Sequence, residues 1–155
     1  EDSHIESIPL AHWLNEFESQ FMEQFGLTKS PLVIKINHNI NNIDFDKNHL
    51  KQIIDNLCSN ALKYGQRDPS HPQIEIQCGA YKTTQHSFIS ISDNGTGIED
   101  TVAAQIFEPF FTTSSSGTGL GLYISNQLAE LNHAKLSYSA NAAGGSTFTL
   151  LINNT

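Results

Sequence analysis

The sequence is poor in basic residues and in cysteine. Eight Lys and Arg stand against sixteen Asp and Glu, which gives a net charge of −8. General nucleic-acid binding depends on Lys and Arg contacts to phosphates, so this balance argues against a nucleic-acid partner. It does not exclude a nucleotide, which backbone N–H groups and a metal ion can hold locally. Cys58 and Cys78 form no C-x-x-C pair and lie in segments with apolar periodicity, so we predict buried thiols in a reducing compartment.

Long apolar runs are also absent. No run approaches the ~18 residues of a membrane-spanning helix, and no charged-then-apolar signal segment opens the chain. We therefore expect a cytoplasmic domain that makes no membrane contact of its own, whether or not the whole protein is anchored in a membrane. The seven His residues are scattered without metal-ligand spacing, which argues against a zinc site. The length of 155 residues fits one domain. Residues 1–8 are expected to be a linker remnant or an edge strand, and residues 9–155 the domain itself.

Apolar periodicity and turn residues divide the chain into helices and strands. We predict helices over residues 10–25, 47–64, 101–105 and 120–131. We predict strands over residues 32–36, 73–80, 88–92, 135–140 and 146–152. An Asn-rich loop is expected before Asp46, which would cap the second helix. The last helix is expected to present one apolar face made of Leu120, Ile124, Leu128 and Leu131. These elements indicate an α+β fold with a mixed sheet layered against helices.

Three polar residues follow one line along the predicted helix 47–64. Asn56, Asn60 and Lys63 are spaced four and three residues apart, so they lie side by side next to the apolar stripe. Amide oxygens suit a hard cation, and an ammonium group suits a phosphate. The row therefore predicts a site for a metal-bound phosphate, with a solvated helix face as the alternative.

An acidic residue directly follows the third predicted strand, residues 88–92, on its core-facing side. Asp93 has the same strand parity as Ile89 and Ile91, and a carboxylate there is costly to bury without a donor. The exocyclic amino group of adenine would be such a donor. Gly95 and Gly97 would let a ligand approach the backbone closely. A plain Asp-Asn-Gly turn is the alternative.

Glycines gather again just before the last predicted helix. Gly117, Gly119 and Gly121 would leave the free N–H groups of the helix N-terminus accessible as an anion cradle. No Lys-Ser or Lys-Thr follows them and no strand runs directly into them, so neither a P-loop nor a Rossmann turn fits. A loop hinge is the alternative. The Phe-rich segment before them is expected to belong either to the core or to a lid over a ligand.

Five short motifs occur in order across nearly the whole chain. They are residues 56–64 (NLCSNALKY), 93–97 (DNGTG), 107–111 (FEPFF), 117–121 (GTGLG) and 144–148 (GGSTF). In this order they resemble the N box, the first glycine box, the F box and the second and last glycine boxes of sensor histidine kinases. The chain thus resembles the catalytic, ATP-binding domain of a two-component sensor kinase, of the fold shared with gyrase, Hsp90 and MutL. The short lid resembles kinases of the nitrogen-regulation and pilus-regulation kind.

The resemblance implies a fold and roles for individual residues. The fold would be a two-layer α/β sandwich, with about five mainly antiparallel strands packed on three helices. Asp93 would accept a hydrogen bond from the adenine amino group, helped by Thr147 through a water. Asn60 would bind Mg²⁺, supported by Asn56, and Lys63 would contact the phosphates of ATP, so Asn60 and Lys63 would be catalytic. The other implied nucleotide contacts are Tyr64, Gly95, Gly97, Ile98, Phe107, Gly117, Thr118, Gly119, Leu120, Gly121 and Leu122. Residues 99–118 would form an ATP lid, anchored by Phe107 and Phe110.

Two features depart from the family pattern. The lid has no Lys or Arg between Phe111 and Gly117, so Mg²⁺, Lys63, Arg67 and backbone N–H groups would have to offset the phosphate charge. None of the seven His residues sits in the setting of a phosphoacceptor. The acceptor His would therefore lie on a separate dimerisation domain, and the isolated chain is expected to be a monomer.

The resemblance favours an ATP-dependent protein-histidine kinase domain. It would bind ATP and ADP, transfer the γ-phosphoryl group to the His of a dimerisation domain of the same protein, and serve relay to a response regulator. Hydrolases of the gyrase, Hsp90 and MutL kind have a Glu at the position of Asn56, and an amide cannot accept a proton at neutral pH. A non-catalytic or weakly hydrolytic nucleotide-binding module is the alternative.

Overall fold

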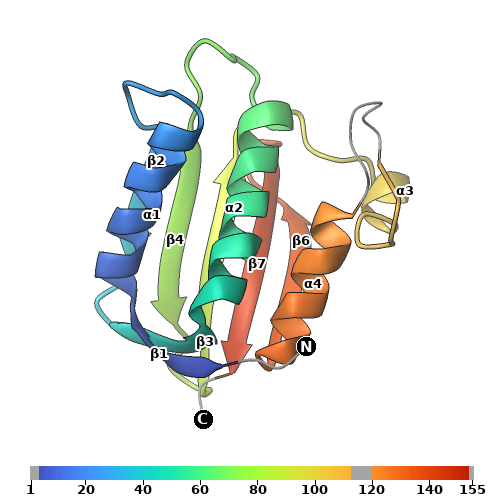
Figure 1. Cartoon of the computed structure of the whole chain (residues 1–155). Helices are drawn as coiled ribbons and strands as arrows, with labels where there is room; N and C mark the ends of the chain where they lie inside the picture. The colour runs from blue at the N-terminus through green and yellow to red at the C-terminus, as the bar shows by residue number, and fades with distance from the viewer. Residues whose placement is uncertain (1–3, 113–119, 154–155) are drawn as a thin grey trace.

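The computed structural model describes residues 4–112 and 120–153, so the predicted contacts Gly117, Thr118 and Gly119 lie outside the described residues. Its helices are α1 (Leu10–Gln24), α2 (Lys47–Tyr64), α3 (Asp100–Ala103) and α4 (Gly121–Leu131). Its strands are β1 (Ile5–Pro9), β2 (Leu32–Ile36), β3 (Asn42–Asp46), β4 (Ile74–Ala80), β5 (His86–Asp93), β6 (Ala134–Ala140) and β7 (Ser146–Asn153) (Figure 1). No helix within the described ranges is both long enough and apolar enough to cross a membrane.

The main sheet has five strands in the order β2-β4-β5-β7-β6. β2 runs parallel to β4, and every other neighbouring pair is antiparallel. α1, α2 and α4 lie side by side on one face of this sheet (Figure 1). The structure confirms the expected α+β sandwich and its five-stranded, mainly antiparallel sheet. The short α3 lies beside α4 as a fourth helix.

The core lies between the helices and the sheet. From α1 it takes the buried side chains Leu10, Leu14, Phe17 and Phe21, and from α2 chiefly Leu50, Ile53, Ile54 and Leu57. The sheet contributes Ile74, Ile76, Cys78, Ile89, Ile91, Leu136, Leu150 and Ile152. The predicted helical and strand periodicities therefore meet in one apolar layer.

Asp46 fixes the first residue of α2. Its Oδ1 accepts hydrogen bonds from the backbone N–H groups of Asn48 at 2.9 Å and His49 at 3.0 Å, which are otherwise unpaired donors in the first turn. Burial would raise the pKa of the Asp46 carboxyl, but the backbone hydrogen bonds from His4, His49 and Asn48 and the nearby His49 ring together lower it. The cap therefore fixes where α2 begins.

Both cysteines are free and buried, as predicted. Burial raises the pKa of the Cys58 thiol, helped by the charge of Asp55. Burial alone raises the pKa of Cys78 to about 12. Both side chains therefore stay protonated at neutral pH and pack as small apolar groups.

The segment expected to be an Asn-rich loop contains β3, so this prediction is wrong. β3 pairs antiparallel with β1 in a separate two-stranded sheet. Ile43 and Phe45 alternate with polar residues and are buried, which is a strand pattern. The neighbouring asparagines obscured it in the sequence. The structure also places residues 5–9 in β1 as the partner of β3.

The apolar face expected on the last helix is only partly correct. Leu128 is buried, but the exposed fractions of Ile124 and Leu131 are 44% and 37%. The buried side of α4 consists of Leu128 with Ser125 and Ala129. The helix is rotated from the expected orientation because Ser125 faces α2, where its hydroxyl accepts a hydrogen bond from Asn56 at 3.1 Å.

Candidate functional site

A cavity of about 810 Å³ opens between α2, the carboxyl end of β5, α3 and the start of α4. Nine of the predicted contacts line it: Asn56, Asn60, Lys63, Tyr64, Asp93, Gly97, Ile98, Gly121 and Leu122. They come from three separate motifs of the sequence. If residues 56–63 were only a solvated helix face and residues 93–97 only a turn, there would be no reason for them to line the same cavity. Their arrangement therefore favours ligand binding by both motifs.

Asp93 lies at one end of the cavity, where β5 ends. Its Oδ1 accepts hydrogen bonds from the backbone N–H groups of Gly95 and Ser146, both at 3.0 Å. Its Oδ2 accepts none from the described residues and faces Gly65, where any Cβ would collide with it. A carboxylate fixed through one oxygen presents its other oxygen as a directed acceptor. Gly65 keeps the approach to that oxygen open.

The turn between β6 and β7 is tied to Asp93 through Asn141. The Asn141 Nδ2 donates to the backbone oxygen of Asp93 at 2.9 Å and to that of Ser146 at 3.3 Å. Its Oδ1 accepts from the backbone N–H groups of Ala143 at 3.1 Å and Gly145 at 3.0 Å. One side chain thus joins both segments that hold the carboxylate. No local sequence pattern links Asn141 to Asp93, so Asn141 was not among the predicted site residues.

Arg67 braces the same end from the segment after α2. Its Nε donates to the backbone oxygen of Gly95 at 2.9 Å, and its Nη2 to that of Ala143 at 3.3 Å. Arg67 does not line the cavity. The expectation that it offsets phosphate charge is therefore wrong in this structure, since its guanidinium is occupied by two carbonyl groups beside Asp93.

Along one wall of the cavity, α2 presents Asn60, Lys63 and Tyr64, and Tyr64 directly precedes Gly65 beside Asp93. The Asn60 side chain forms no hydrogen bond with the described residues, so its amide oxygen is available to a ligand. Lys63 is exposed, and its Nζ lies 5.9 Å from the centre of the Phe25 ring. Tyr64 is 60% exposed at the rim. Asn60 and Lys63 thus have fewer hydrogen bonds to described residues than Asp93 has.

Asn56 lies one turn earlier on α2 and connects it to α4. Its Nδ2 donates to the Ser125 hydroxyl at 3.1 Å. Its Oδ1 faces Gly121, where a Cβ would lie only 2.5 Å away. Glycine at position 121 therefore lets the first turn of α4 approach α2 at the edge of the cavity.

Gly97 takes a conformation that favours glycine. Its φ is +82°, and a Cβ there would lie 2.6 Å from the backbone oxygen of Gly144. The motif 93–97 and the turn before β7 consequently pack backbone against backbone. This explains physically why two of the five motifs are rich in glycine.

The walls of the cavity are largely apolar and include residues that the sequence analysis did not select. The apolar ones are Leu57, Ala61, Ile91, Val102, Ile106, Phe111 and Phe148, and the others are Gly65, Thr96, Glu99, Thr112 and Ser146. Most look like ordinary core residues in the sequence. Ser146 could have been predicted as a site residue from the sequence, because strand alternation places it on the same side as Phe148.

Four predicted contacts do not line the cavity: Gly95, Phe107, Leu120 and Thr147. The Thr147 hydroxyl is 2.8 Å from the Ser92 hydroxyl, and alternation places both on the opposite side of the sheet from Ser146. Ser146, not Thr147, therefore stands beside Asp93. Gly95 contributes through its backbone, which bonds to Asp93 and Arg67.

The aromatic anchors of the segment after α3 also differ from expectation. Phe110 is 73% exposed and has a φ of +66°, so it anchors nothing in this structure. Phe111 lines the cavity instead. Phe107 makes an edge-on contact with Phe148, with ring centres 6.3 Å apart. Of the predicted lid, residues 113–118 lie outside the described residues.

Comparisons with known proteins agree with this geometry. Residues 45–155 match the family model described as "Histidine kinase-, DNA gyrase B-, and HSP90-like ATPase". The chain belongs to this ATPase family. Among curated relatives, it is 29% identical over 145 residues to the sensor protein kinase PilS of Pseudomonas aeruginosa, covering 94% of this chain and 27% of that protein. It is 35% identical over 120 residues to the histidine-protein kinase AtoS of Escherichia coli, covering 77% of this chain and 19% of that protein.

Solved structures of histidine kinases have the same fold. The catalytic domain of histidine kinase ThkA superposes with a TM-score of 0.76 at 23% identity, covering 98% of this chain and 97% of that one. Full-length ShkA, in complex with AMPPNP, gives a TM-score of 0.79 at 19% identity, covering 99% of this chain and 32% of that one. Membership of an ATPase family of histidine kinase type supports ATP as the ligand. The chain spans less than a third of the length of PilS and AtoS.

Proposed function

We propose that this chain is the ATP-binding catalytic domain of a sensor histidine kinase, with Asp93 as the group that recognises the base. The observation that carries the proposal is the carboxylate of Asp93 at the end of an apolar-walled cavity. Its Oδ1 accepts two hydrogen bonds, and its Oδ2 accepts none from the described residues. Adenine offers an exocyclic amino donor and an apolar ring face, which match Oδ2 and the surrounding aliphatic side chains. The interaction joins a charged acceptor to a neutral donor and is worth about 1.5–3 kcal/mol.

The opposite end suits the phosphates. Lys63 can turn from the Phe25 ring toward a phosphate at little cost, since an exposed cation–π contact is worth about 0.5–1 kcal/mol. Leu120 directly precedes α4, and Gly121 and Leu122 begin it. The N-terminus of this helix favours negative charge. We assign the predicted phosphate contacts Gly117, Thr118 and Gly119 to the same region of the ligand.

Mg²⁺ fits the donor set at this end. The described residues contain no group of three or more His, Cys, Asp or Glu side chains that could hold a metal, so a divalent ion would rely on amide, phosphate and water oxygens. Mg²⁺ accepts such a site, because it keeps several waters and takes few protein ligands. Asn60 would hold it through its amide oxygen. When bound, Mg²⁺ neutralises charge on the phosphates.

The reaction we assign is transfer of the γ-phosphoryl group to a His of a separate dimerisation domain, for relay to a response regulator. Phosphoryl transfer needs positioning and charge neutralisation rather than covalent work by the protein. Asn60 and Lys63 are the residues that would do this. Water activation is disfavoured, because Asn56 is an amide already committed to Ser125 and cannot act as a base.

Mixing the chain with the purified dimerisation domain of the same protein and γ-labelled ATP tests this function. Label should accumulate on the His of that domain, while hydrolysis by the chain alone stays slow. Asn60→Ala should remove the label, and Asn48→Ala, at the exposed start of the same helix, should not. Fast hydrolysis without the second domain would overturn the proposal. So would nucleotide binding without any transfer of label, which would identify a non-catalytic module.

A further inference from the structure

A second cavity, of about 780 Å³, opens at the β6 edge of the sandwich. Its walls are α3 and the residue Phe107 on one side, α4 on another, and β6 along its floor. Five consecutive residues, Ala134 to Tyr138, line it. Side chains of a strand alternate between two faces, so a lining made of consecutive residues includes the strand backbone itself. The cavity is therefore a groove along the edge of a strand, and we call it the β6 groove.

The backbone on this side of β6 lacks a partner strand. β6 pairs with β7 on one side, and no other described strand pairs with its second side. In an antiparallel edge strand, every second residue directs both its N–H and its C=O away from the neighbouring strand. Such a row of donors and acceptors is a template for one more strand. β6 contains no proline to block it.

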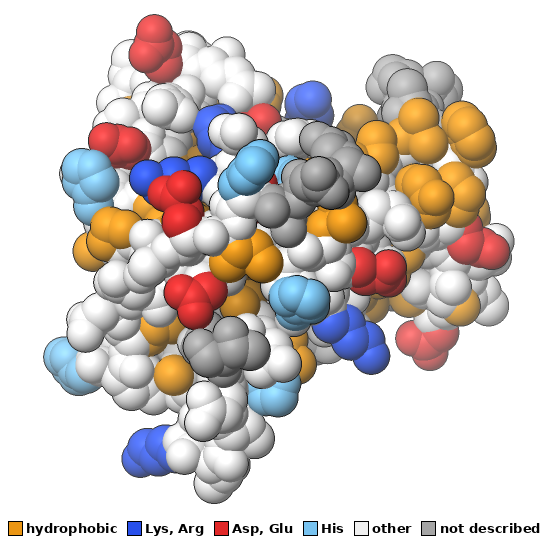
Figure 2. All heavy atoms as spheres, turned by 60° about the horizontal axis from the view of Figure 1, so that its bottom comes forward, with side chains coloured by type: hydrophobic (Ala, Val, Ile, Leu, Met, Phe, Trp, Pro, Cys, Tyr) orange, Lys and Arg blue, Asp and Glu red, His pale blue; other side chains and the backbone are white. Residues whose placement is uncertain are grey.

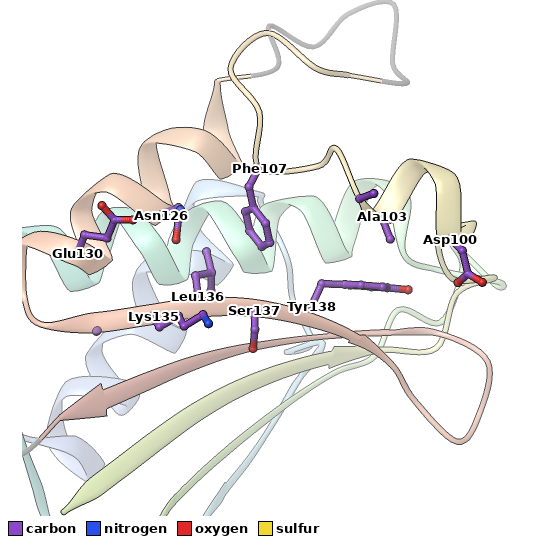
Figure 3. Close-up of a pocket in the computed structure, with 11 residues that line it drawn as sticks. Asp100, Ala103, Phe107, Asn126, Glu130, Lys135, Leu136, Ser137 and Tyr138 are labelled. Carbon is purple, nitrogen blue, oxygen red and sulfur yellow. The ribbon is translucent and has the colours of Figure 1, made fainter.

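The side chains that line the groove leave space and an unsatisfied hydrogen-bonding group. Figure 3 shows Phe107 pointing from the turn after α3 toward β6, and the ring of Tyr138 lying along the floor beneath α3. The Tyr138 hydroxyl is buried and has no hydrogen-bond partner among the described residues. A buried hydroxyl without a partner is unusual in folded proteins. Ala103, the last residue of α3, and Ala104, which follows it, are small and leave room above the ring.

The charges at the groove favour a basic occupant. Asp100 on α3 and Glu130 on α4 line it, against Lys135 on β6. None of these three forms an ion pair with another described residue, whereas Lys35 on the opposite edge strand is paired with Glu75 at 2.7 Å. The chain as a whole carries −8. On the face drawn in Figure 2, hydrophobic side chains gather on the side where Figure 1 places α3.

We propose that the β6 groove binds an extended, basic segment of a partner protein, which adds to the sheet as a strand beside β6. Alternate apolar side chains of the segment enter the space between Phe107 and Tyr138. Its Lys or Arg side chains reach Asp100 and Glu130. Main-chain pairing supplies affinity and the alternate side chains supply specificity, as in other cases of strand addition. This inference does not depend on the nucleotide, and its test contains none.

The test uses the acetylated and amidated peptide (Lys-Val)4, carrying a fluorophore, with the whole chain. Fluorescence anisotropy should report saturable binding. A peptide with the same side chains but every backbone nitrogen methylated should bind at least tenfold more weakly, and so should (Glu-Val)4. Equal binding of the parent and methylated peptides would overturn strand pairing, because only general charge attraction would remain.

Two variants on α3 locate the site. Ala103→Trp fills the groove and should weaken binding of (Lys-Val)4 at least tenfold. Thr101→Trp adds the same side chain to the same helix at an exposed position that lines neither cavity, and it should change binding less than twofold. Equal effects of the two variants would contradict the assignment.

Hydrogen exchange gives an independent readout. The peptide should slow exchange at alternate amides of β6 and leave β2, at the other edge of the sheet, unaffected. Protection at β2, or at neither strand, would overturn the proposal. Protection of β6 that rises with the concentration of the chain alone would also overturn it, since the occupant would then be a second copy of this chain.

Discussion

The two ends of the candidate nucleotide cavity differ in how firmly the protein holds them. At the base end, Asp93 is bound to two backbone N–H groups, and Asn141 and Arg67 tie the surrounding turns together. At the phosphate end, Asn60 makes no hydrogen bond to the described residues and Lys63 is exposed. The base end is thus formed before any ligand arrives, whereas the phosphate end is completed by what binds there.

This difference has an energetic consequence. A preformed group loses little conformational freedom on binding, so its hydrogen bond contributes nearly in full to affinity. The same bonds also stabilise the folded chain. We therefore expect substitutions at the base end to reduce both the free energy of unfolding and nucleotide affinity, and substitutions at the phosphate end to reduce affinity alone.

Asn141→Ala should have the largest effect. It removes the side chain that joins the β6–β7 turn to Asp93, and we expect a loss of ~2–3 kcal/mol in the free energy of unfolding together with weaker ATP binding. Chemical denaturation and calorimetry measure the two quantities. Asn39→Ala is the matched control, because Asn39 bonds to the backbone N and O of Ala80 in another turn. It should lower stability and leave ATP affinity unchanged. An unchanged ATP affinity in Asn141→Ala would contradict the claim that the bonds around Asp93 serve both folding and nucleotide binding.

Asn60→Ala should come next and should affect binding only. Without ligand, its thermal midpoint should match the wild type, since Asn60 bonds to no described residue. The extra stability conferred by ATP with Mg²⁺ should fall by ~1–2 kcal/mol, while any stabilisation by adenosine should persist. A lower midpoint without ligand would mean that the phosphate end is already part of the folded framework.

Lys63→Met should weaken ATP binding by ~1 kcal/mol, or about fivefold, and leave adenosine binding unchanged. The effect is modest because Lys63 is exposed and its charge is screened by solvent. Lys51→Met is the control on the same helix, since the Lys51 Nζ lies 5.3 Å from the Phe17 ring centre and away from the cavity. If the two variants lost equal ATP affinity, the effect would come from the net charge of the chain and not from a contact between Lys63 and the phosphates.

The smallest predicted effect concerns Asp46, which lies outside both ends and caps the helix that serves them. Its pKa is lowered from 3.8 in the folded chain, so its charge contributes stability at neutral pH that is lost as pH falls through the lowered folded value. Asp46→Asn keeps a capping oxygen and should cost ~0.5 kcal/mol at pH 6. The difference from the wild type should shrink below pH 4. A difference that does not vary with pH would assign the effect to packing.

The sequence predicted the elements that carry the site because their signals are local. Asp46 capped α2 where expected, and strand parity placed Asp93 with Ile91 on the cavity side. The errors arose where distant contacts decide the outcome. Arg67 turned toward Gly95 and Ala143, and α4 rotated to bring Ser125 to Asn56. Thr147 was assigned in place of Ser146, although strand alternation distinguishes the two.

The account depends most directly on recognition of the base by Asp93. Calorimetry with ATP and with inosine triphosphate tests it, because inosine carries a carbonyl oxygen where adenine carries the amino donor. The wild type should prefer ATP by at least ~10-fold, and Asp93→Asn should abolish that preference, since an amide can also donate to the carbonyl. Equal affinity of the wild type for both nucleotides, or a preference that survives Asp93→Asn, would contradict the assignment.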